Sequence, residues 1–183
     1  MPCMKKFAIA FAIFCLLPAF RLYSQQMIVQ EKVVPPSCYN GNDGMAFLVI
    51  RNAVDTISIQ WMHNNSVNDT VTNLSAGYYS YMVVDSAYPN NPWIDSIYVN
   101  NPQPLQLHPR PGAASCFGAS DGHVELVVTG GTPPYGFLWS SGFTGRNLAA
   151  VPAGTYTVMV RDAKGCLRTR SVQVPQPNPV TVQ

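Results

Sequence analysis

The sequence predicts an all-β protein made of two tandem copies of a small antiparallel β-sandwich. Three observations carry this prediction: the composition, an internal repeat, and hydrophobic side chains that alternate with a period of two. Of the 183 residues, 47% are hydrophobic, which is enough to bury a core. Glutamate, a good helix former, occurs only at Glu31 and Glu125, whereas threonine, valine, serine and tyrosine are frequent. The composition therefore argues against helical bundles and doubly wound α/β enzymes.

Residues 1–24 have the pattern of a secretory signal peptide. Lys5 and Lys6 precede an apolar run over residues 7–20, which is too short to span a membrane and suits the core of a signal peptide. We expect cleavage before Gln25, with a second candidate site at Ala19. The mature chain is therefore expected to be secreted or held at the outer cell surface.

Cleavage changes the charge balance of the chain. The full sequence has 11 basic and 9 acidic side chains, and loss of Lys5, Lys6 and Arg21 leaves 8 basic ones, so the mature net charge is −1. Nucleic-acid binding needs a concentrated basic face, so we expect no nucleic acid as a partner. No other apolar stretch is long enough for a membrane span, and none is expected in the mature chain.

An internal repeat divides the mature chain into two modules. A shift of 78 residues superposes a cysteine, an Asp-Gly pair and a tryptophan: Cys38 on Cys116, Asp43 on Asp121, and Trp61 on Trp139. Slightly smaller shifts continue the match to two prolines near each module's end. We expect one module over residues 25–104 and a second over residues 105–183, with a proline-rich junction at 102–111. The last residues, 179–182, resemble the first strand of a further unit.

Hydrophobic side chains alternate with polar ones in both copies. The pattern covers residues 57–61 in the first copy and residues 135–139 and 156–160 in the second. A period of two predicts antiparallel strands with one buried and one solvated face, and the turn at 162–165 predicts a tight hairpin with positive φ at its glycine. A tryptophan on a middle strand and a tyrosine after an Ala-Gly corner are typical of immunoglobulin-like (Ig-like) sandwiches, which we predict for each module.

The cysteines suggest a covalent staple for these small modules. Cys3 and Cys15 leave with the signal peptide, so the mature chain keeps Cys38, Cys116 and Cys166. We predict a disulfide between Cys116, which opens the second module, and Cys166, which opens its last strand. Closing this loop of about 50 residues would add roughly 4 kcal/mol in the chain-entropy model. Cys38 is then left either as a buried thiol or as a partner for another chain.

The second module contains an ordered series of short motifs. They are Cys116 with Asp121-Gly122, Gly130-Gly131-Thr132-Pro133-Pro134-Tyr135, Trp139, Ala153-Gly154-Thr155-Tyr156 and Gly165-Cys166. This series resembles the SprB-type repeat. The first module is similar to a degenerate copy that lacks the Gly-Gly-Thr-Pro-Pro segment and the second cysteine.

The resemblance implies a secreted or cell-surface protein of gliding and related Gram-negative bacteria. In that group such modules are strung into adhesins, which are typically exported by the type IX secretion route. These adhesins usually carry many repeats and a C-terminal sorting domain. The resemblance therefore implies that this chain is either a fragment of a longer adhesin or is retained at the surface in another way.

No enzymatic function is predicted. Residues 118–122 match the G-x-S-x-G pattern of a nucleophile elbow, but a strand rather than a helix is expected to follow, and the first module has no serine at the equivalent position. The histidines show no paired metal-ligand spacing, and Glu31 and Glu125 do not form an expected glycosidase pair. No cofactor is expected. Asp43 and Asp121 lie in Asp-Gly turns, where they could serve as calcium ligands or simply as turn formers.

Four triplets in the first module read aspartate, hydroxyl residue, aliphatic residue. Their hydroxyls belong to Thr56, Thr70, Ser86 and Ser96. The pattern resembles the O-glycosylation acceptor of the bacterial group in which SprB-type repeats occur, which implies glycans at these positions. Strand alternation combined with turn-forming aspartates is the alternative explanation.

Together these features predict a non-enzymatic repeat protein that acts as a spacer or adhesin segment in surface adhesion or gliding motility. Its expected partner is a surface polysaccharide or a protein, together with further repeat modules. The alternative is a carbohydrate-binding module of a secreted polysaccharide-processing system. Five aromatic residues could then stack on sugars: Tyr39, Phe117, Trp93, Tyr88 and Phe143. A planar, exposed aromatic row would favour the sugar binder, and buried rings would favour the spacer.

Overall fold

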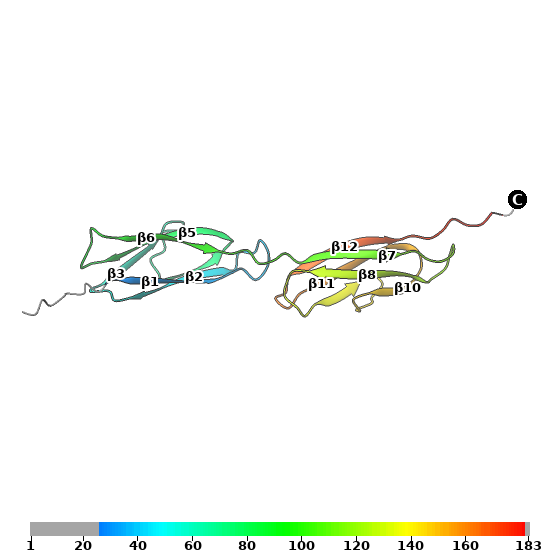
Figure 1. Ribbon diagram of the computed structural model, residues 1–183, viewed down its shortest axis with the longest axis horizontal. Coiled ribbons are helices and arrows are strands. Elements are labelled where there is room, and N and C mark those ends of the chain that lie inside the picture. The colour runs from blue at the N-terminus through cyan, green and yellow to red at the C-terminus, as the bar shows by residue number, and fades with distance from the viewer. Residues whose placement is uncertain (1–25, 182–183) are drawn as a thin grey trace, which may run out of the picture.

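A computed structural model describes residues 26–181, which form two β-sandwiches placed end to end (Figure 1). Twelve strands and no helix occur in this range, and all strand pairs are antiparallel. The predicted fold class of tandem Ig-like sandwiches is confirmed. The proposed signal peptide, residues 1–24, lies outside the described residues.

The first sandwich contains strands β1 to β6. Their bounds are β1 (Ile28–Val34), β2 (Gly44–Arg51), β3 (Ile57–Trp61), β4 (Thr70–Leu74), β5 (Gly77–Asp85) and β6 (Trp93–Val99). They form two three-stranded sheets with the orders β1-β2-β4 and β3-β5-β6. Strands β1 and β6 therefore lie at sheet edges.

The second sandwich repeats this topology with strands β7 to β12. Their bounds are β7 (Gln106–Gly112), β8 (Gly122–Thr129), β9 (Gly136–Trp139), β10 (Leu148–Val151), β11 (Gly154–Arg161) and β12 (Leu167–Val174). The sheets have the orders β7-β8-β10 and β9-β11-β12. Each strand of the second sandwich thus takes the place of the strand six earlier in the chain, as an internal repeat requires.

Each sandwich has its own core, built around one tryptophan. Trp61 and Trp139 are 0% and 2% exposed. Each is the last residue of an edge strand, β3 or β9, and the alternation along that strand turns its side chain inward. Each indole N–H finds a carbonyl oxygen across the sandwich: Trp61 donates to Asn68 at 2.9 Å and Trp139 to Gly145 at 3.0 Å. Satisfying the one polar atom of the indole lets the ring be buried completely.

Both modules contain the tyrosine corner that the Ala-Gly motif predicts. The hydroxyl of Tyr79 donates to the carbonyl oxygen of Ser75, and that of Tyr156 donates to Pro152, each at 2.9 Å. In each case the tyrosine hydroxyl bonds the residue four positions earlier and so stabilises the turn that leads into the long strand β5 or β11. Two independent copies of one corner are strong support for duplication of a single fold.

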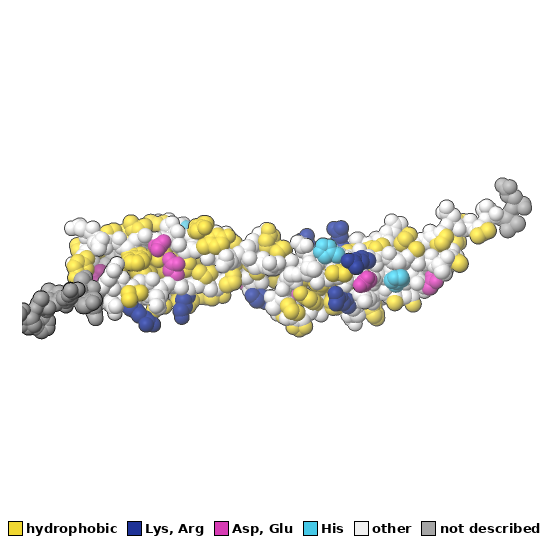
Figure 2. All heavy atoms as spheres, in the orientation of Figure 1, with side chains coloured by type: hydrophobic (Ala, Val, Ile, Leu, Met, Phe, Trp, Pro, Cys, Tyr) yellow, Lys and Arg dark blue, Asp and Glu magenta, His cyan; other side chains and the backbone are white. Residues whose placement is uncertain are grey.

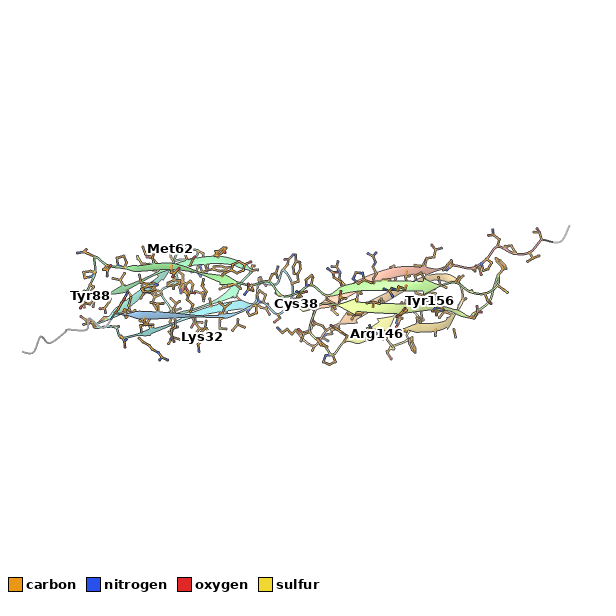
Figure 3. All side chains as sticks on the ribbon, in the orientation of Figure 1. Lys32, Cys38, Met62, Tyr88, Arg146 and Tyr156 are labelled. Atoms are coloured by element: carbon orange, nitrogen blue, oxygen red, sulfur yellow. A yellow bond between two sulfur atoms is a disulfide. The ribbon has the colours of Figure 1, made fainter. Side chains whose placement is uncertain are left out.

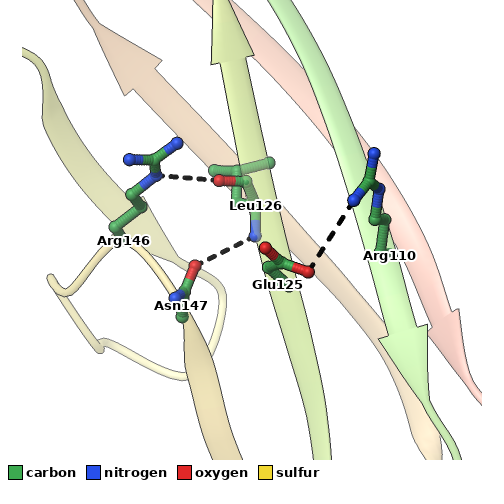
Figure 4. A network of polar contacts seen from close by, with 5 residues as sticks. All are labelled: Arg110, Glu125, Leu126, Arg146 and Asn147. Atoms are coloured by element: carbon green, nitrogen blue, oxygen red, sulfur yellow. Dashed lines mark hydrogen bonds and ion pairs between the residues drawn. The ribbon is translucent and has the colours of Figure 1, made fainter.

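A network of polar side chains contacts β8 next to the point where β10 begins (Figure 4). Asn147 accepts the N–H of Leu126 at 3.0 Å, and Arg146 donates to the carbonyl oxygen of Leu126 at 2.9 Å. These side chains replace the backbone partner that the irregular β8–β10 pairing does not supply. Arg110 and Glu125 lie 4.0 Å apart with both side chains mostly exposed, so this pair adds little stability.

Candidate functional site

The most distinctive feature of the molecule is a disulfide between its two modules. Cys38 of the first module bonds Cys166 of the second, with Cα atoms 5.5 Å apart and a sequence separation of 128 (Figure 3). The predicted Cys116–Cys166 bond is therefore wrong, and Cys116 is an exposed free thiol. Cys38 is neither a buried thiol nor bonded to another chain.

The direction of the strands explains why Cys116 does not pair with Cys166. Cys116 precedes β8 at the end of the module where Ala114 donates to Pro175, beyond β12, whereas Cys166 lies in the β11–β12 hairpin at the opposite end. An eight-residue strand such as β8 spans about 25 Å, and bonded cysteines need Cα atoms within about 7 Å. The two cysteines of the second module are therefore too far apart to pair.

The loop that carries Cys38 is held by one carboxylate. Asp43 accepts the N–H of Ser37 at 2.8 Å, and Gly41 donates to the carbonyl oxygen of Cys38 at 2.9 Å. The hydrogen bonds from Ser37 hold the pKa of Asp43 below its ordinary value, so this carboxyl stays ionised and keeps accepting them. Asn40, with φ of 58°, donates its N–H to the side chain of Asn101 in the linker at 2.9 Å. The turn thus presents Cys38 toward the second module.

The hairpin that carries Cys166 is also organised by a carboxylate. Asp162 is 5% exposed and accepts the N–H groups of Lys164 and Cys166 with one oxygen and that of Thr132 with the other, each at 2.9 Å. Gly165 has φ of 88°, the positive value predicted for this turn. Asp162 therefore ties the hairpin to the Gly-Gly-Thr segment beside it.

That Gly-Gly-Thr segment holds the linker between the modules. Gly130 has φ of 65°, and a Cβ added to it would lie 2.1 Å from the carbonyl oxygen of Pro104. Gly131 donates its N–H to the carbonyl oxygen of Gln103 at 3.2 Å. Leu105, which follows, is 7% exposed and belongs to the second core. The glycine pair is thus the part of the second module that lets the linker pass close against it.

An open cleft of about 560 Å³ lies at this junction. Both modules and the linker contribute to its lining, which includes Tyr39, Gln103, Leu167 and Arg168. Tyr39 is 50% exposed, so the junction offers one aromatic ring rather than a row of them.

A second surface of interest is the outer face of the β3-β5-β6 sheet. Cross-strand register pairs Tyr78 with Tyr98, and their ring centroids are 4.6 Å apart with a tilt of 40°. Tyr78 is 75% exposed and Tyr98 46% exposed. The outward positions of the three strands are all uncharged: Ser58, Gln60, Tyr78, Ser80, Met82, Val84, Ile94, Ser96 and Tyr98. Figure 2 shows hydrophobic side chains gathered along this upper edge of the first module. We call this surface the tyrosine face.

Comparison with known proteins bears on the second module. The family model described as "SprB repeat" matches residues 114–144, which include the Cys116 loop, β8, the Gly-Gly-Thr-Pro-Pro segment and β9. The second module carries an SprB repeat. The chain matches no curated protein sequence.

The chain resembles several solved structures at low sequence identity, and the first of those given below, with a TM-score above 0.5, shares its fold. The three N-terminal domains of the highly immunogenic outer capsid protein of bacteriophage RB49 match with a TM-score of 0.54 and 14% identity, covering 82% of this chain and 59% of that one. The intimin fragment in complex with the translocated intimin receptor matches with a TM-score of 0.38, 13% identity and coverages of 82% and 64%. An amphioxus IgVJ-C2 molecule matches with a TM-score of 0.34 and 17% identity, covering 84% of this chain and 98% of that one. This chain spans less than two thirds of the first two structures.

The aromatic residues singled out from the sequence do not form one surface. Tyr39 lies at the junction, Phe117 lies at the far end of the SprB repeat, and Trp93 begins β6 at the opposite end of the first module, packed against that module's core. Phe117 is 57% exposed. Tyr88 and Phe143 are exposed in separate turns. Sequence reasoning missed Tyr78 and Tyr98, although their even positions, opposite in phase to the buried Tyr81 and Ile97, could have indicated an outward pair.

The two calcium candidates have structural partners. Asp121 in the SprB repeat accepts the N–H of Ser115 at 2.9 Å, as Asp43 does with Ser37, and this bond likewise lowers the pKa of Asp121. Within residues 26–181 no group of three metal-ligating side chains is present. In the same range no helix is long and apolar enough to cross a membrane.

Three of the four hydroxyls in the Asp-hydroxyl-aliphatic triplets are exposed: those of Thr56, Ser86 and Ser96. The fourth, Thr70, is half-buried and donates to Asp69 at 2.8 Å. Thr56 and Ser86 are neighbours, since Ser86 donates its N–H to the carbonyl oxygen of Thr56 at 2.9 Å. Both therefore lie at the end of the first module that faces away from the junction.

Proposed function

We propose that the chain is a non-enzymatic segment of a cell-surface adhesin, in which two modules are held in line as a stiff spacer. The observation that carries this proposal is the Cys38–Cys166 disulfide across the junction. A disulfide forms in oxidising compartments, which supports export of the chain. Joining two separately cored sandwiches removes the free hinge motion that a short linker between domains would otherwise allow. The SprB repeat in the second module supports the adhesin assignment.

The proposal is tested in the bacterium that produces the protein. Protease treatment of intact cells should degrade the protein if it is displayed at the surface, and deletion of its gene should reduce attachment of cells to a solid surface. When reintroduced into the deletion strain, the double variant Cys38→Ser/Cys166→Ser, which keeps both cores and loosens the junction, should restore attachment only in part.

Movement of the same cells over agar tests a role in gliding separately. Full protection from protease, or unchanged attachment after deletion, would contradict the proposal.

A second candidate function is binding of a neutral polysaccharide by the tyrosine face. Its support is the exposed Tyr78–Tyr98 pair on a face without charged side chains. The Ser80–Ser96 pair lies next to the tyrosines, and Gln60 lies farther along the same face, opposite Met82. Sugar rings present apolar C–H faces, which stack on aromatic rings, and hydroxyls, which bond to serine and glutamine. The absence of charge on this face favours an uncharged ligand.

Replacing Tyr78 and Tyr98 by alanine is expected to weaken binding of a neutral polysaccharide by about 30-fold, because two aromatic contacts together contribute about 2 kcal/mol. Titration calorimetry against a panel of neutral and acidic polysaccharides measures this effect. Phe117→Ala is the matched control, since the exposure of Phe117, 57%, lies between those of Tyr98 and Tyr78 and this ring lies on the other module. If the wild-type chain binds no member of the panel, or if F117A has the same effect, the tyrosine face does not bind these sugars.

We also propose O-linked glycans on the first module at Thr56, Ser86 and Ser96, with Thr70 as a fourth acceptor. The exposure of the first three hydroxyls supports this proposal. The intact mass of the protein secreted by its own bacterium should exceed the polypeptide mass, and T56A/S86A should lose part of the excess. A mass equal to that of the polypeptide would contradict it. Because Ser96 lies on the tyrosine face, a glycan there would also cover Tyr98.

A further inference from the structure

The loop that joins the first module to the second has a near copy at the far end of the second module. In the first, Asp43 accepts from Ser37 and Gly41 donates to Cys38; in the second, Asp121 accepts from Ser115 and Ala119 donates to Cys116, with distances from 2.8 to 3.1 Å throughout. The residue two after each cysteine has a positive φ, 58° at Asn40 and 78° at Gly118. Cys116 therefore occupies the place that Cys38 occupies, on the same scaffold.

The segment after each module is also repeated. Asn101 follows β6 and accepts the N–H of Asn40; Gln176 follows β12 and accepts the N–H of Gly118, both at 2.9 Å. Prolines then recur in step, and Val180 stands where Leu105 stands after the first module. Leu105 is 7% exposed in the core of the second module, whereas Val180 is 93% exposed. The second module thus presents an apolar anchor and a thiol in the arrangement that docks the first module onto the second.

The surface of the second module that contacts the first has two parts, and the first module lacks both. Gly130-Gly131-Thr132 accommodates the linker between the modules, and the Asp162–Cys166 hairpin is bonded to the Cys38 loop of the first module. In the first module the equivalent hairpin runs from Asp85 to Trp93 and contains no cysteine. Asp85 is nevertheless retained, 5% exposed, and accepts the N–H groups of Val54 and Ala87. The fold of the hairpin region is kept, and only the parts that contact a preceding module are missing.

We propose that Cys116 is the loop half of a second inter-module disulfide, and that its partner is the Gly-Cys hairpin of another SprB-type module. Two thiols would lose two protons and two electrons to a disulfide oxidant such as glutathione disulfide, which is reduced to two thiols as the new S–S bond forms. Val180 would enter the core of the incoming module as Leu105 enters that of the second. The modules would then form a chain in which each loop bonds the hairpin of the next module.

The partner cannot be the hairpin of the same module or that of an intact second copy. In both, Cys166 is already bonded to Cys38, and in the same module it also lies at the opposite end. The partner must be a module whose hairpin cysteine is free and whose Gly-Gly-Thr segment is unoccupied. This inference does not depend on which ligand the surface protein binds.

The test extends the natural chain. Residues 1–180 are continued with a second copy of residues 106–183, so that Val180 stands where Leu105 does. The extended chain is expressed in an oxidising compartment and then exposed to glutathione disulfide. Peptide mapping without reduction should find Cys116 linked to the added hairpin cysteine, which is the copy of Cys166 in the added module. Labelling of Cys116 by a maleimide should fall at least tenfold relative to the natural chain. Changing the added hairpin cysteine to serine is the matched control and should restore the labelling.

Two results would overturn the proposal: Cys116 that stays reactive in the extended chain, or a bond between the two cysteines of the added module. The Cys38–Cys166 bond serves as an internal report that the natural part has folded. If that bond is lost in the extended chain, the natural chain is instead treated with a peptide of residues 160–168 carrying an activated cysteine. Mixed-disulfide formation with Cys116 should be at least tenfold faster than with a scrambled peptide, and equal rates would count against the proposal.

Discussion

Trp139→Ala is expected to lower the free energy of unfolding of the second module by about 3–5 kcal/mol, the range found for removal of large aromatic side chains from a core. The ring is 2% exposed, and its N–H bond to Gly145 holds the β9–β10 connection. Truncation leaves a cavity and deprives that carbonyl of its donor. The first module has a separate core and should keep its stability.

Chemical denaturation followed by circular dichroism measures the loss, and the fluorescence of Trp61 and Trp93 follows the first module separately. Leu138→Ala is the matched control, because Leu138 precedes Trp139 on β9 but points outward and is 44% exposed. It should cost about 0.5 kcal/mol or less, as surface substitutions usually do. A loss shared equally by both modules would show that the cores are not independent.

Removal of the inter-module disulfide is expected to have the second large effect. The bond closes a loop with a sequence separation of 128 residues, and the chain-entropy model assigns such a loop about 5 kcal/mol of stabilisation. Cys38→Ser/Cys166→Ser should therefore unfold at lower denaturant concentration while retaining both β-sandwiches. Small-angle scattering should in addition show a broader range of distances between the modules, because only residues 100–105 then connect them.

The control for the disulfide variant is Cys116→Ser, which removes a thiol that bonds nothing in the described residues. It should leave both the unfolding midpoint and the scattering curve of the natural chain unchanged. If the double variant scatters like the wild type, packing at the linker rather than the disulfide fixes the junction.

The fold was accessible from the sequence because local pattern and tertiary structure agree. Alternation placed Trp61 and Trp139 on inward positions, and the Ala-Gly-x-Tyr motif located the corners of Tyr79 and Tyr156. The junction was not accessible in the same way. Spacing along the chain says that Cys116 and Cys166 belong to one module, but not that antiparallel strands carry them to opposite ends of it.

The candidate surfaces were harder to predict for a related reason. Each depends on which residues from distant segments come together, as Gly130 does with Pro104 and Tyr78 with Tyr98. Cross-strand register decides the second pair, and register follows from turn lengths that single-sequence patterns fix poorly. The absence of the Gly-Gly-Thr-Pro-Pro segment from the first module looked like degeneration, whereas the structure ties that segment to the linker of a preceding module.

The position of the disulfide also determines how the molecule would bear a pulling force. Tension applied at the two ends would run along β1 to Cys38, cross the sulfur bridge to Cys166, and leave along β12. Everything between those cysteines, including both tryptophan cores, would lie outside the loaded path. Some 128 residues, roughly 400 Å of extended chain, could not be drawn out while the bridge remained oxidised. Such a tether would lengthen under load only by separation of β1 and β12 from their sheets. Reduction of the disulfide would make the rest of the chain extensible.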